Sequence, residues 1–105
     1  MKILTVCENG NNRSVHFAHR LKYWGHDIIP IGVRTNSSET IKMLCEWADI
    51  IILTSSEPHI AVPSEYISKV RLFDVGPDIY KRPFNPELDT KVKQLLEDNK
   101  SWLKV

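Results

Sequence analysis

Short apolar runs alternate along the chain with segments in which apolar residues recur at helical spacing. The apolar, partly β-branched runs that predict buried strands are residues 2–6, 27–31, 50–54 and 70–75. The segments with helical periodicity are residues 14–24, 39–48 and 86–103. This order predicts an α/β fold in a single domain over residues 1–105. It is a three-layer sandwich in which a four-stranded parallel sheet is flanked by helices on both faces.

Polar residues and prolines mark the ends of these elements. Ser14 is a predicted N-cap for the first helix, and Asn36-Ser37-Ser38-Glu39 resembles a capping box that opens the second. Asn85 and Pro86 suit the N-cap and first position of the last helix. Pro30 has no amide hydrogen, which indicates an edge position for the second strand.

Each predicted helix carries an apolar face that can join the core. These faces contain Phe17, Leu21 and Trp24 in the first helix, Ile41, Leu44, Cys45 and Ala48 in the second, and Leu88, Val92, Leu95 and Leu96, with Trp102 or Leu103, in the last. Cys45 is therefore expected to be an unreactive core residue. His16 and His19 lie three residues apart, but no further ligand completes a metal site, so we expect both to be exposed and predict no metal.

One polar stretch between the first strand and the first helix has the composition of an anion-binding loop. It reads Cys7-Glu8-Asn9-Gly10-Asn11-Asn12-Arg13-Ser14, a cysteine followed after five residues by Arg-Ser. Glycine and asparagine tolerate the left-handed backbone angles with which a tight loop turns its N–H groups inward. The following helix adds unpaired amides and its positive dipole end, so the loop is predicted to bind phosphate or sulfate.

The side chains at the two ends of this loop suit phosphate chemistry. The field of the loop favours the thiolate form of Cys7, which is the nucleophilic form. The planar guanidinium of Arg13 can bind two phosphate oxygens at once. Ser14 can donate its hydroxyl to the Cys7 thiolate, or act only as an N-cap. These features predict a phosphate-binding loop with a cysteine nucleophile.

A second polar loop follows the fourth predicted strand and emerges at the same edge of the sheet. Ligands of parallel sheets bind at the carboxyl ends of the strands. Asp78 could therefore protonate a leaving group and later activate water. Asp74 is the alternative acid, although its position at a strand end favours a structural role. Tyr80 could form an aromatic wall for a flat substrate or shield the edge of the core, and both interpretations stay open.

Composition narrows the class of protein. The chain has 105 residues, of which 42% are hydrophobic and 26% charged, as in one ordinary globular domain. The formal net charge of +1 gives no reason to expect a nucleic-acid or membrane partner. The longest apolar run, residues 50–53, is too short to span a bilayer, and no signal-peptide pattern is evident. Two cysteines make no disulfide framework, so we expect a cytoplasmic protein.

Taken together, these residues resemble the low-molecular-weight protein tyrosine phosphatase family. The resemblance rests on Val6-Cys7, Arg13-Ser14, Glu46-Trp47-Ala48-Asp49-Ile50 and the run from Leu72 to Tyr80. It implies that Cys7 is the nucleophile, that Arg13 and the backbone of residues 8–13 bind phosphate, and that Asp78 is the general acid. It also implies hydrolysis of phosphotyrosine or another phosphate monoester, on a phosphorylated protein or a small molecule. No metal or organic cofactor is implied.

The loop departs from the family pattern at two places. The family usually carries Gly-Asn at the second and third positions after the cysteine, where this chain has Asn9-Gly10. The asparagine that supports the loop is thus displaced, and Asn9 or Asn11 is expected to replace it. Many members also have a second cysteine before the arginine, where this chain has Asn12. Reversible disulfide protection of Cys7 is therefore not expected.

The same scaffold supports functions other than hydrolysis. Arsenate reduction needs further thiols, and only Cys45 is available. A phosphotransferase-type cysteine carrier does not normally use the arginine that is present here as Arg13. A non-catalytic phosphate-binding or protein-interaction module remains an alternative. A Walker-type nucleotide site is excluded because no Gly-Lys-Ser/Thr follows the loop.

Overall fold

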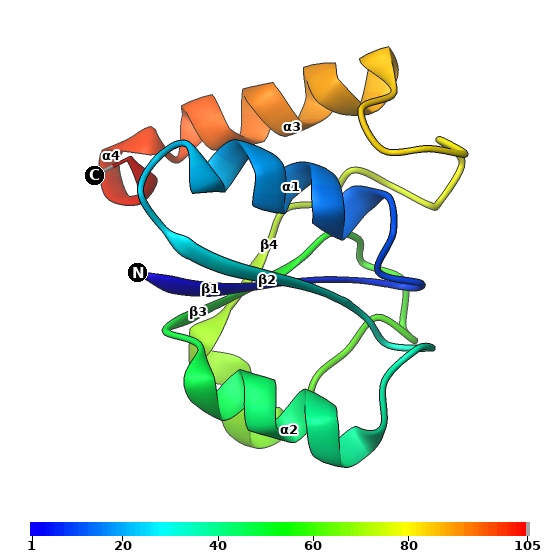
Figure 1. The fold of residues 1–105 in the computed structure, drawn as a ribbon, viewed down its shortest axis with the longest axis vertical. Coiled ribbons are helices and arrows are strands. Elements are labelled where there is room, and N and C mark those ends of the chain that lie inside the picture. The colour runs from blue at the N-terminus through cyan, green and yellow to red at the C-terminus, as the bar shows by residue number, and fades with distance from the viewer. Residues whose placement is uncertain (105) are drawn as a thin grey trace.

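The computed structural model describes residues 1–104 (Figure 1). In chain order the elements are β1 (Lys2–Cys7), α1 (Arg13–Lys22), β2 (Asp27–Gly32), α2 (Ser38–Trp47), β3 (Ile50–Leu53), the 3-10 helix η1 (Ser64–Lys69), β4 (Val70–Leu72), α3 (Pro86–Asp98) and α4 (Lys100–Leu103). The four strands form one parallel sheet in the order β2-β1-β3-β4.

Helices cover both faces of this sheet. Helices α1, α3 and α4 lie on one face, and α2 with η1 lies on the other (Figure 1). The predicted three-layer α/β sandwich is therefore confirmed. Strand β2 is an edge strand, as Pro30 indicated, because only β1 pairs with it. The carboxyl ends of β1 and β2 lie together at the right of Figure 1, where the chain turns into the loops that precede α1 and α2.

Two apolar clusters fill the space between the layers, because successive strand residues point to opposite faces. Ile3 of β1 packs with Phe17 and Leu21 of α1 and with the buried face of α3. On the other face, Leu4 and Val6 pack with residues of α2 and η1. Cys45 lies in this second cluster with no exposed surface, so its prediction as a core residue is confirmed.

Several boundaries differ from the sequence-based expectations, and residues 86–103 form two helices, α3 and α4, that meet at Asn99. Helix α1 begins at Arg13, so Ser14 lies inside the helix and is not its N-cap. Helix α2 is capped by Ser37, whose hydroxyl accepts from the amide of Thr40, rather than by a box that uses Glu39. Strand β4 ends at Leu72 instead of residue 75. The amides of Phe73 and Val75 still donate to the carbonyls of Leu53 and Thr54, and the chain then turns where the carboxylate of Asp74 accepts from the amide of Gly76 at 2.8 Å.

The two histidines of α1 have different surroundings. His19 is exposed, as expected, whereas His16 has no exposed surface, so its prediction was wrong. His16 is buried by tertiary packing. Helix α3 and the segment before it cover this part of α1 and supply partners for the imidazole.

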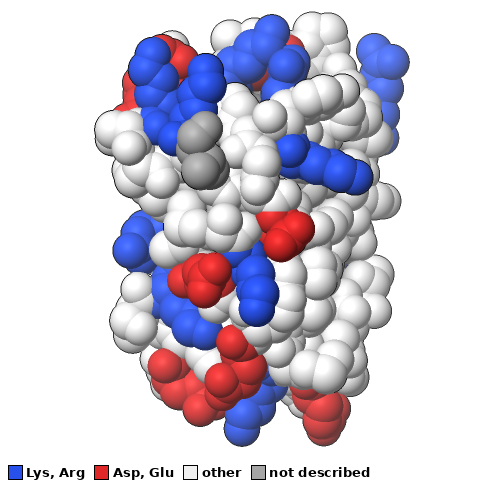
Figure 2. Space-filling model, turned by 60° about the vertical axis from the view of Figure 1, so that its left-hand side comes forward, with Lys and Arg blue, Asp and Glu red and all other residues white. Residues whose placement is uncertain are grey.

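Charged side chains are distributed without a dominant sign on the face shown in Figure 2, where Lys and Arg are interspersed with Asp and Glu. Among the described residues, no helix is both long enough and apolar enough to cross a membrane.

Candidate active site: the loop between β1 and α1

The loop that joins β1 to α1 crosses the end of β2 at a contact between two glycines. Gly10 has a φ of +76°, a conformation that side-chain-bearing residues rarely adopt. A Cβ on Gly10 would lie 2.6 Å from the amide nitrogen of Gly32, and one on Gly32 would lie 2.2 Å from the carbonyl carbon of Asn9. Both positions therefore require glycine. The order Asn9-Gly10 places glycine where the two backbones meet.

This contact, rather than an asparagine side chain, supports the loop. The side chains of Asn9 and Asn11 are exposed, and neither makes a hydrogen bond to another described residue. The backbone instead continues the pairing of β1 with β2, because the amides of Val33 and Arg34 donate to the carbonyls of Cys7 and Glu8 at 2.9 Å.

Cys7 lies at the carboxyl end of β1 with 2% of its surface exposed. The amide of Gly10 donates to its Sγ at 3.1 Å, and the hydroxyl of Ser14 lies 3.1 Å from the same atom. Both groups can donate to a thiolate. The N-terminus of α1 also favours a negative charge on Sγ. The side chain of Asn12 at the N-cap position makes no capping hydrogen bond, so it does not occupy the amides at this positive end of the helix.

Arg13, the first residue of α1, is completely buried beside this loop. Its Nη1 donates to the carboxylate of Glu57 and to the carbonyl of Gly76, both at 2.8 Å. Its Nε and Nη2 have no partner, and they are the only buried side-chain nitrogen or oxygen atoms of residues 1–104 in that state. Nε and Nη2 form one edge of the guanidinium, the edge that binds two oxygens of an oxyanion. A buried cation with a free bidentate edge is suited to an anionic ligand.

Glu57 was not identified from the sequence, because the weak patterning of residues 55–66 predicts only a short helical or irregular crossover. It follows β3 at the ligand-binding edge of the sheet, and this position was the available signal. Hydrogen bonds from Arg13 and from the Ser55 hydroxyl hold the pKa of the Glu57 carboxyl below its usual value. Glu57 is thus ionised at neutral pH and fixes one edge of the Arg13 guanidinium.

The structure brings Asp78 to this loop. The amide side chain of Asn12 donates to Asp78 Oδ1 at 3.2 Å, which joins the loop after β4 to the N-terminus of α1. Asp78 is partly exposed. Asp74, the alternative acid, is exposed and accepts from the amide of Gly76, which is a turn-forming role.

Tyr80 lies in the core rather than at the mouth of the site. Only 2% of its surface is exposed. Its hydroxyl donates to the carbonyl of Val75 at 2.5 Å and accepts from Lys91 Nζ at 2.9 Å. As placed, its ring cannot contact a substrate, so Tyr80 shields the edge of the core and does not form an aromatic wall.

Glu8 lies on the outer side of the loop, in an exposed network of charges. Its carboxylate pairs with Arg34 Nε at 2.5 Å and lies 3.6 Å from His59 Nε2. With Glu57, Glu8 and His59 form the one cluster of described residues whose geometry could hold a metal ion. Both carboxylates already pair with arginines, Glu8 with Arg34 and Glu57 with Arg13. These pairs neutralise the charge that would attract a cation.

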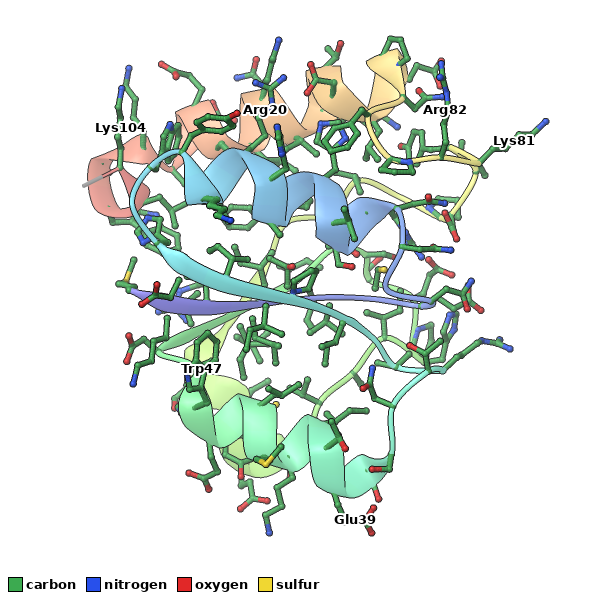
Figure 3. The ribbon with its side chains drawn as sticks, viewed as in Figure 1. Arg20, Glu39, Trp47, Lys81, Arg82 and Lys104 are labelled. Carbon is green, nitrogen blue, oxygen red and sulfur yellow. The ribbon has the colours of Figure 1, made fainter. Side chains whose placement is uncertain are left out.

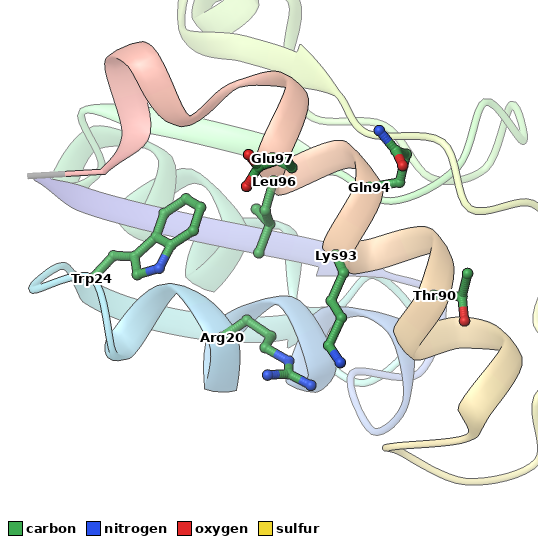
Figure 4. Close-up of a pocket in the computed structure, with 7 residues that line it drawn as sticks. All are labelled: Arg20, Trp24, Thr90, Lys93, Gln94, Leu96 and Glu97. Atoms are coloured by element: carbon green, nitrogen blue, oxygen red, sulfur yellow. The ribbon is translucent and has the colours of Figure 1, made fainter.

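A second concavity lies between α1 and α3 and carries different chemistry (Figure 4). It is lined by Arg20, Trp24, Thr90, Lys93, Gln94, Leu96 and Glu97. Arg20 and Lys93 both pair with Asp89, so their charges are satisfied within the protein. This groove contains no cysteine, and the loop at Cys7 is therefore the candidate site.

The chain matches no family model and no curated protein, but it does match solved structures. Wzb from Vibrio vulnificus, solved in complex with benzylphosphonate, matches with a TM-score of 0.66 at 19% identity, covering 98% of this chain and 97% of Wzb. The chain has the fold of the low-molecular-weight phosphatases. This confirms the fold that the resemblance of the sequence implied.

Two further structures with this fold differ in the substrate that their names state. The YwlE arginine phosphatase from Geobacillus stearothermophilus matches with a TM-score of 0.61 at 17% identity, over 95% of this chain and 93% of its own. The tyrosine phosphatase Wzb from Escherichia coli K30, in complex with sulphate, matches with a TM-score of 0.60 at 16% identity, over 97% and 95%. The phosphatase fold therefore does not by itself decide which phosphorylated side chain is the substrate.

Proposed function

We propose that this protein is a cysteine-dependent phosphatase that hydrolyses phosphate monoesters, with phosphotyrosine as the favoured substrate. The observation that carries the proposal is the completely buried Arg13, whose Nε and Nη2 have no partner in the described part of the protein. The charge of Arg13 is paired with Glu57, but two buried N–H donors without an acceptor are costly, and an oxyanion would accept from both. The adjacent loop supplies a nucleophile, Cys7, and the amide of Gly10 that points at its sulfur, which together suit a phosphoryl group.

The reaction proceeds in two balanced steps. In the first, the Cys7 thiolate attacks phosphorus while the bond from phosphorus to the leaving oxygen breaks, and Asp78 protonates that oxygen. In the second, the Asp78 carboxylate takes a proton from water. The resulting hydroxide attacks the phosphocysteine and releases phosphate and the Cys7 thiolate. The guanidinium of Arg13 and the amide of Gly10 stabilise the charge of the transferring group in both steps.

An aryl phosphate suits the surface next to the acid. Ile79, adjacent to Asp78, is 61% exposed and offers an apolar surface that Tyr80 does not. Arsenate reduction is disfavoured because Cys45 is completely buried, and burial raises the pKa of its thiol. A thiol in this state is a poor electron relay.

Hydrolysis of p-nitrophenyl phosphate by four proteins tests the proposal. We expect the wild type to be active between about pH 5 and pH 7, and Cys7→Ser to be inactive. Asp78→Asn should lose about a hundredfold or more in rate, as expected for loss of a general acid. Asp74→Asn is the matched control, because it removes a nearby carboxylate of the same loop, and it should retain most of the activity.

The outcomes separate the alternatives. A folded wild type without activity, whose Tm nevertheless rises with added phosphate, would identify a non-catalytic phosphate-binding module. Loss of activity in Asp74→Asn but not in Asp78→Asn would reverse the assignment of the acid.

A further inference from the structure

His16 is a buried titratable group that the reaction described above does not use. It lies one turn after Arg13 in α1 and has no exposed surface. Its Nε2 lies 2.6 Å from the carboxylate of Asp89 in α3, and its Nδ1 lies 3.2 Å from the backbone amide nitrogen of Phe84. Its ring also packs against that of Phe84, with 5.1 Å between ring centroids.

These contacts determine which nitrogen of the imidazole carries the proton. Although burial opposes it, hydrogen bonds from Arg20, His16 and Lys93 hold the pKa of the Asp89 carboxyl well below its usual range. Figure 3 shows Arg20 between α1 and α3. Asp89 is therefore ionised and accepts a hydrogen bond from Nε2–H. The amide of Phe84 can only donate, so Nδ1 must be the acceptor.

Burial supports the same protonation state. It lowers the pKa of His16 below its ordinary value, because desolvation outweighs the attraction of Asp89. The neutral Nε2–H tautomer satisfies both partners. A protonated imidazole would place an N–H against the amide of Phe84. His16 thus acts as a fixed hydrogen-bond bridge from Asp89 to the backbone of Phe84.

Phe84 lies near the end of the loop that carries Asp78. This loop runs from β4 to α3, and α1 with its N-cap residue holds it at three points. Arg13 binds the carbonyl of Gly76, Asn12 binds the carboxylate of Asp78, and His16 binds the amide of Phe84.

The backbone of this loop needs such support. Lys81 and Phe84 are the only described non-glycine residues with positive φ, at 64° and 63°. Such conformations persist only where surrounding contacts stabilise them. The side chains of Lys81 and Arg82 project away from the loop in Figure 3, and both residues are exposed. Their side chains therefore do not anchor the loop, and of its three contacts with α1 and Asn12 the one at Phe84 lies nearest to them in the chain.

We propose that His16 is a positioning residue that holds the loop of the general acid Asp78 against α1 through the Phe84 amide. The proposal rests on the proposed phosphatase function. It predicts that loss of this hydrogen bond damages only the step that needs the acid, while the loop of Cys7 and Arg13 continues to bind and attack phosphate.

Two conservative substitutions separate the two hydrogen bonds of His16. The amide oxygen of His16→Asn lies near the place of Nδ1 and can still accept from Phe84. The longer side chain of His16→Gln reaches toward Asp89 and loses the acceptor for Phe84. The control is His19→Leu, since His19 also packs against the ring of Phe84, at 4.8 Å between centroids, but makes no hydrogen bond to another described residue.

Leaving-group dependence of kcat/KM provides a readout that general loss of structure would not give. 2,4-Dinitrophenyl phosphate has a leaving group that needs no protonation, whereas phenyl phosphate needs the acid. We expect His16→Gln to lower kcat/KM for phenyl phosphate about tenfold or more, and for the dinitrophenyl ester less than twofold. His16→Asn and His19→Leu should stay within about threefold of the wild type on both. In an Asp78→Asn background, His16→Gln should have no further effect on phenyl phosphate.

Equal losses on both esters, or unchanged kcat/KM for phenyl phosphate in His16→Gln, would overturn the positioning role while leaving the phosphatase function intact. A wild type inactive on both esters would overturn the function and this role together. Independently of any variant, NMR of the wild type should show His16 as the neutral Nε2–H tautomer at pH 7. It should also show slow exchange of the Phe84 amide hydrogen. The Nδ1–H tautomer would refute the tether.

Discussion

Substitution of Gly10 by alanine tests whether the contact of the loop with β2 creates the site. The new Cβ would lie 2.6 Å from Gly32 N and 2.9 Å from the carbonyl carbon of Ile31. The first distance is about 0.8 Å shorter than the 3.4 Å at which ordinary contact begins. Both neighbours are backbone atoms of a paired strand, so the loop itself must move.

The expected destabilisation has two parts. Alanine at a φ of +76° costs about 1–2 kcal/mol in backbone strain. The steric conflict adds about 1–3 kcal/mol, which is typical of overpacking in a region that cannot relax freely. We therefore expect Gly10→Ala to lower the free energy of unfolding by about 3 kcal/mol, as measured by urea denaturation.

Movement of the loop should also change the reactivity of Cys7. Displacement removes the amide of Gly10 from Sγ, a hydrogen bond to a charged group worth about 1.5–3 kcal/mol. A loss of about 1.4 kcal/mol of stabilisation of the attacking sulfur corresponds to a tenfold lower rate. The rate of Cys7 alkylation by iodoacetate at pH 6 should fall by about that factor.

Gly25→Ala is the matched control for this experiment. Gly25 has a φ of +88°, but a Cβ there meets nothing within 4 Å. It should therefore show the strain alone, about 1–2 kcal/mol, with unchanged alkylation of Cys7. If Gly10→Ala and Gly25→Ala behave alike in both assays, the glycine contact does not support the loop and our account of it is incorrect.

Two further predictions concern Glu57, the partner of buried Arg13, and the buried imidazole of His16. Glu57→Ala removes a partner of buried Arg13, and it should cost about 1–3 kcal/mol of stability and about tenfold in kcat/KM for an aryl phosphate. Glu65→Ala, which lacks any contact with Arg13, should change neither quantity, and equal effects of the two variants would contradict this role. Because burial lowers the native pKa of His16, the unfolded chain binds a proton first as the pH falls below about 6.5. The free energy of unfolding should fall toward pH 5, by at most about 1.4 kcal/mol per pH unit, and less steeply in His16→Gln; an identical slope in both proteins would contradict the buried neutral imidazole.

The fold could be predicted from the sequence because its information is local. Each apolar run and each stretch of helical periodicity lies within one continuous segment of the chain. Pro30 and Pro86 restrict the backbone through their own covalent geometry. The predicted ends of helices and strands were wrong where contacts with other residues, rather than the local pattern, determine them. Strand β4 ends at Leu72, although the amides of Phe73 and Val75 still donate to the carbonyls of Leu53 and Thr54, and no periodicity records this ending.

Some residues of the candidate site could likewise be predicted from the local sequence, and others could not. Cys7 and Arg13 lie within one short stretch, so their spacing alone predicts a shared loop, and Asp78 follows from the rule that parallel strands end at one edge. Glu57 follows β3 at this same edge, but its role and that of His16 could not be predicted, because they depend on partners more than forty residues away in the chain, at Arg13 and at Phe84.

The central claim is that Cys7 carries the phosphoryl group during turnover. Acid quenching of a single turnover of the enzyme with an aryl phosphate, followed by peptide mass spectrometry, tests it directly. We expect the peptide that contains Cys7 to gain the mass of one phosphoryl group and to accumulate in Asp78→Asn, where hydrolysis of the intermediate is slowed. An active enzyme whose Cys7 peptide stays unmodified under these conditions, with phosphoryl transfer intact in Cys7→Ser, would contradict the account.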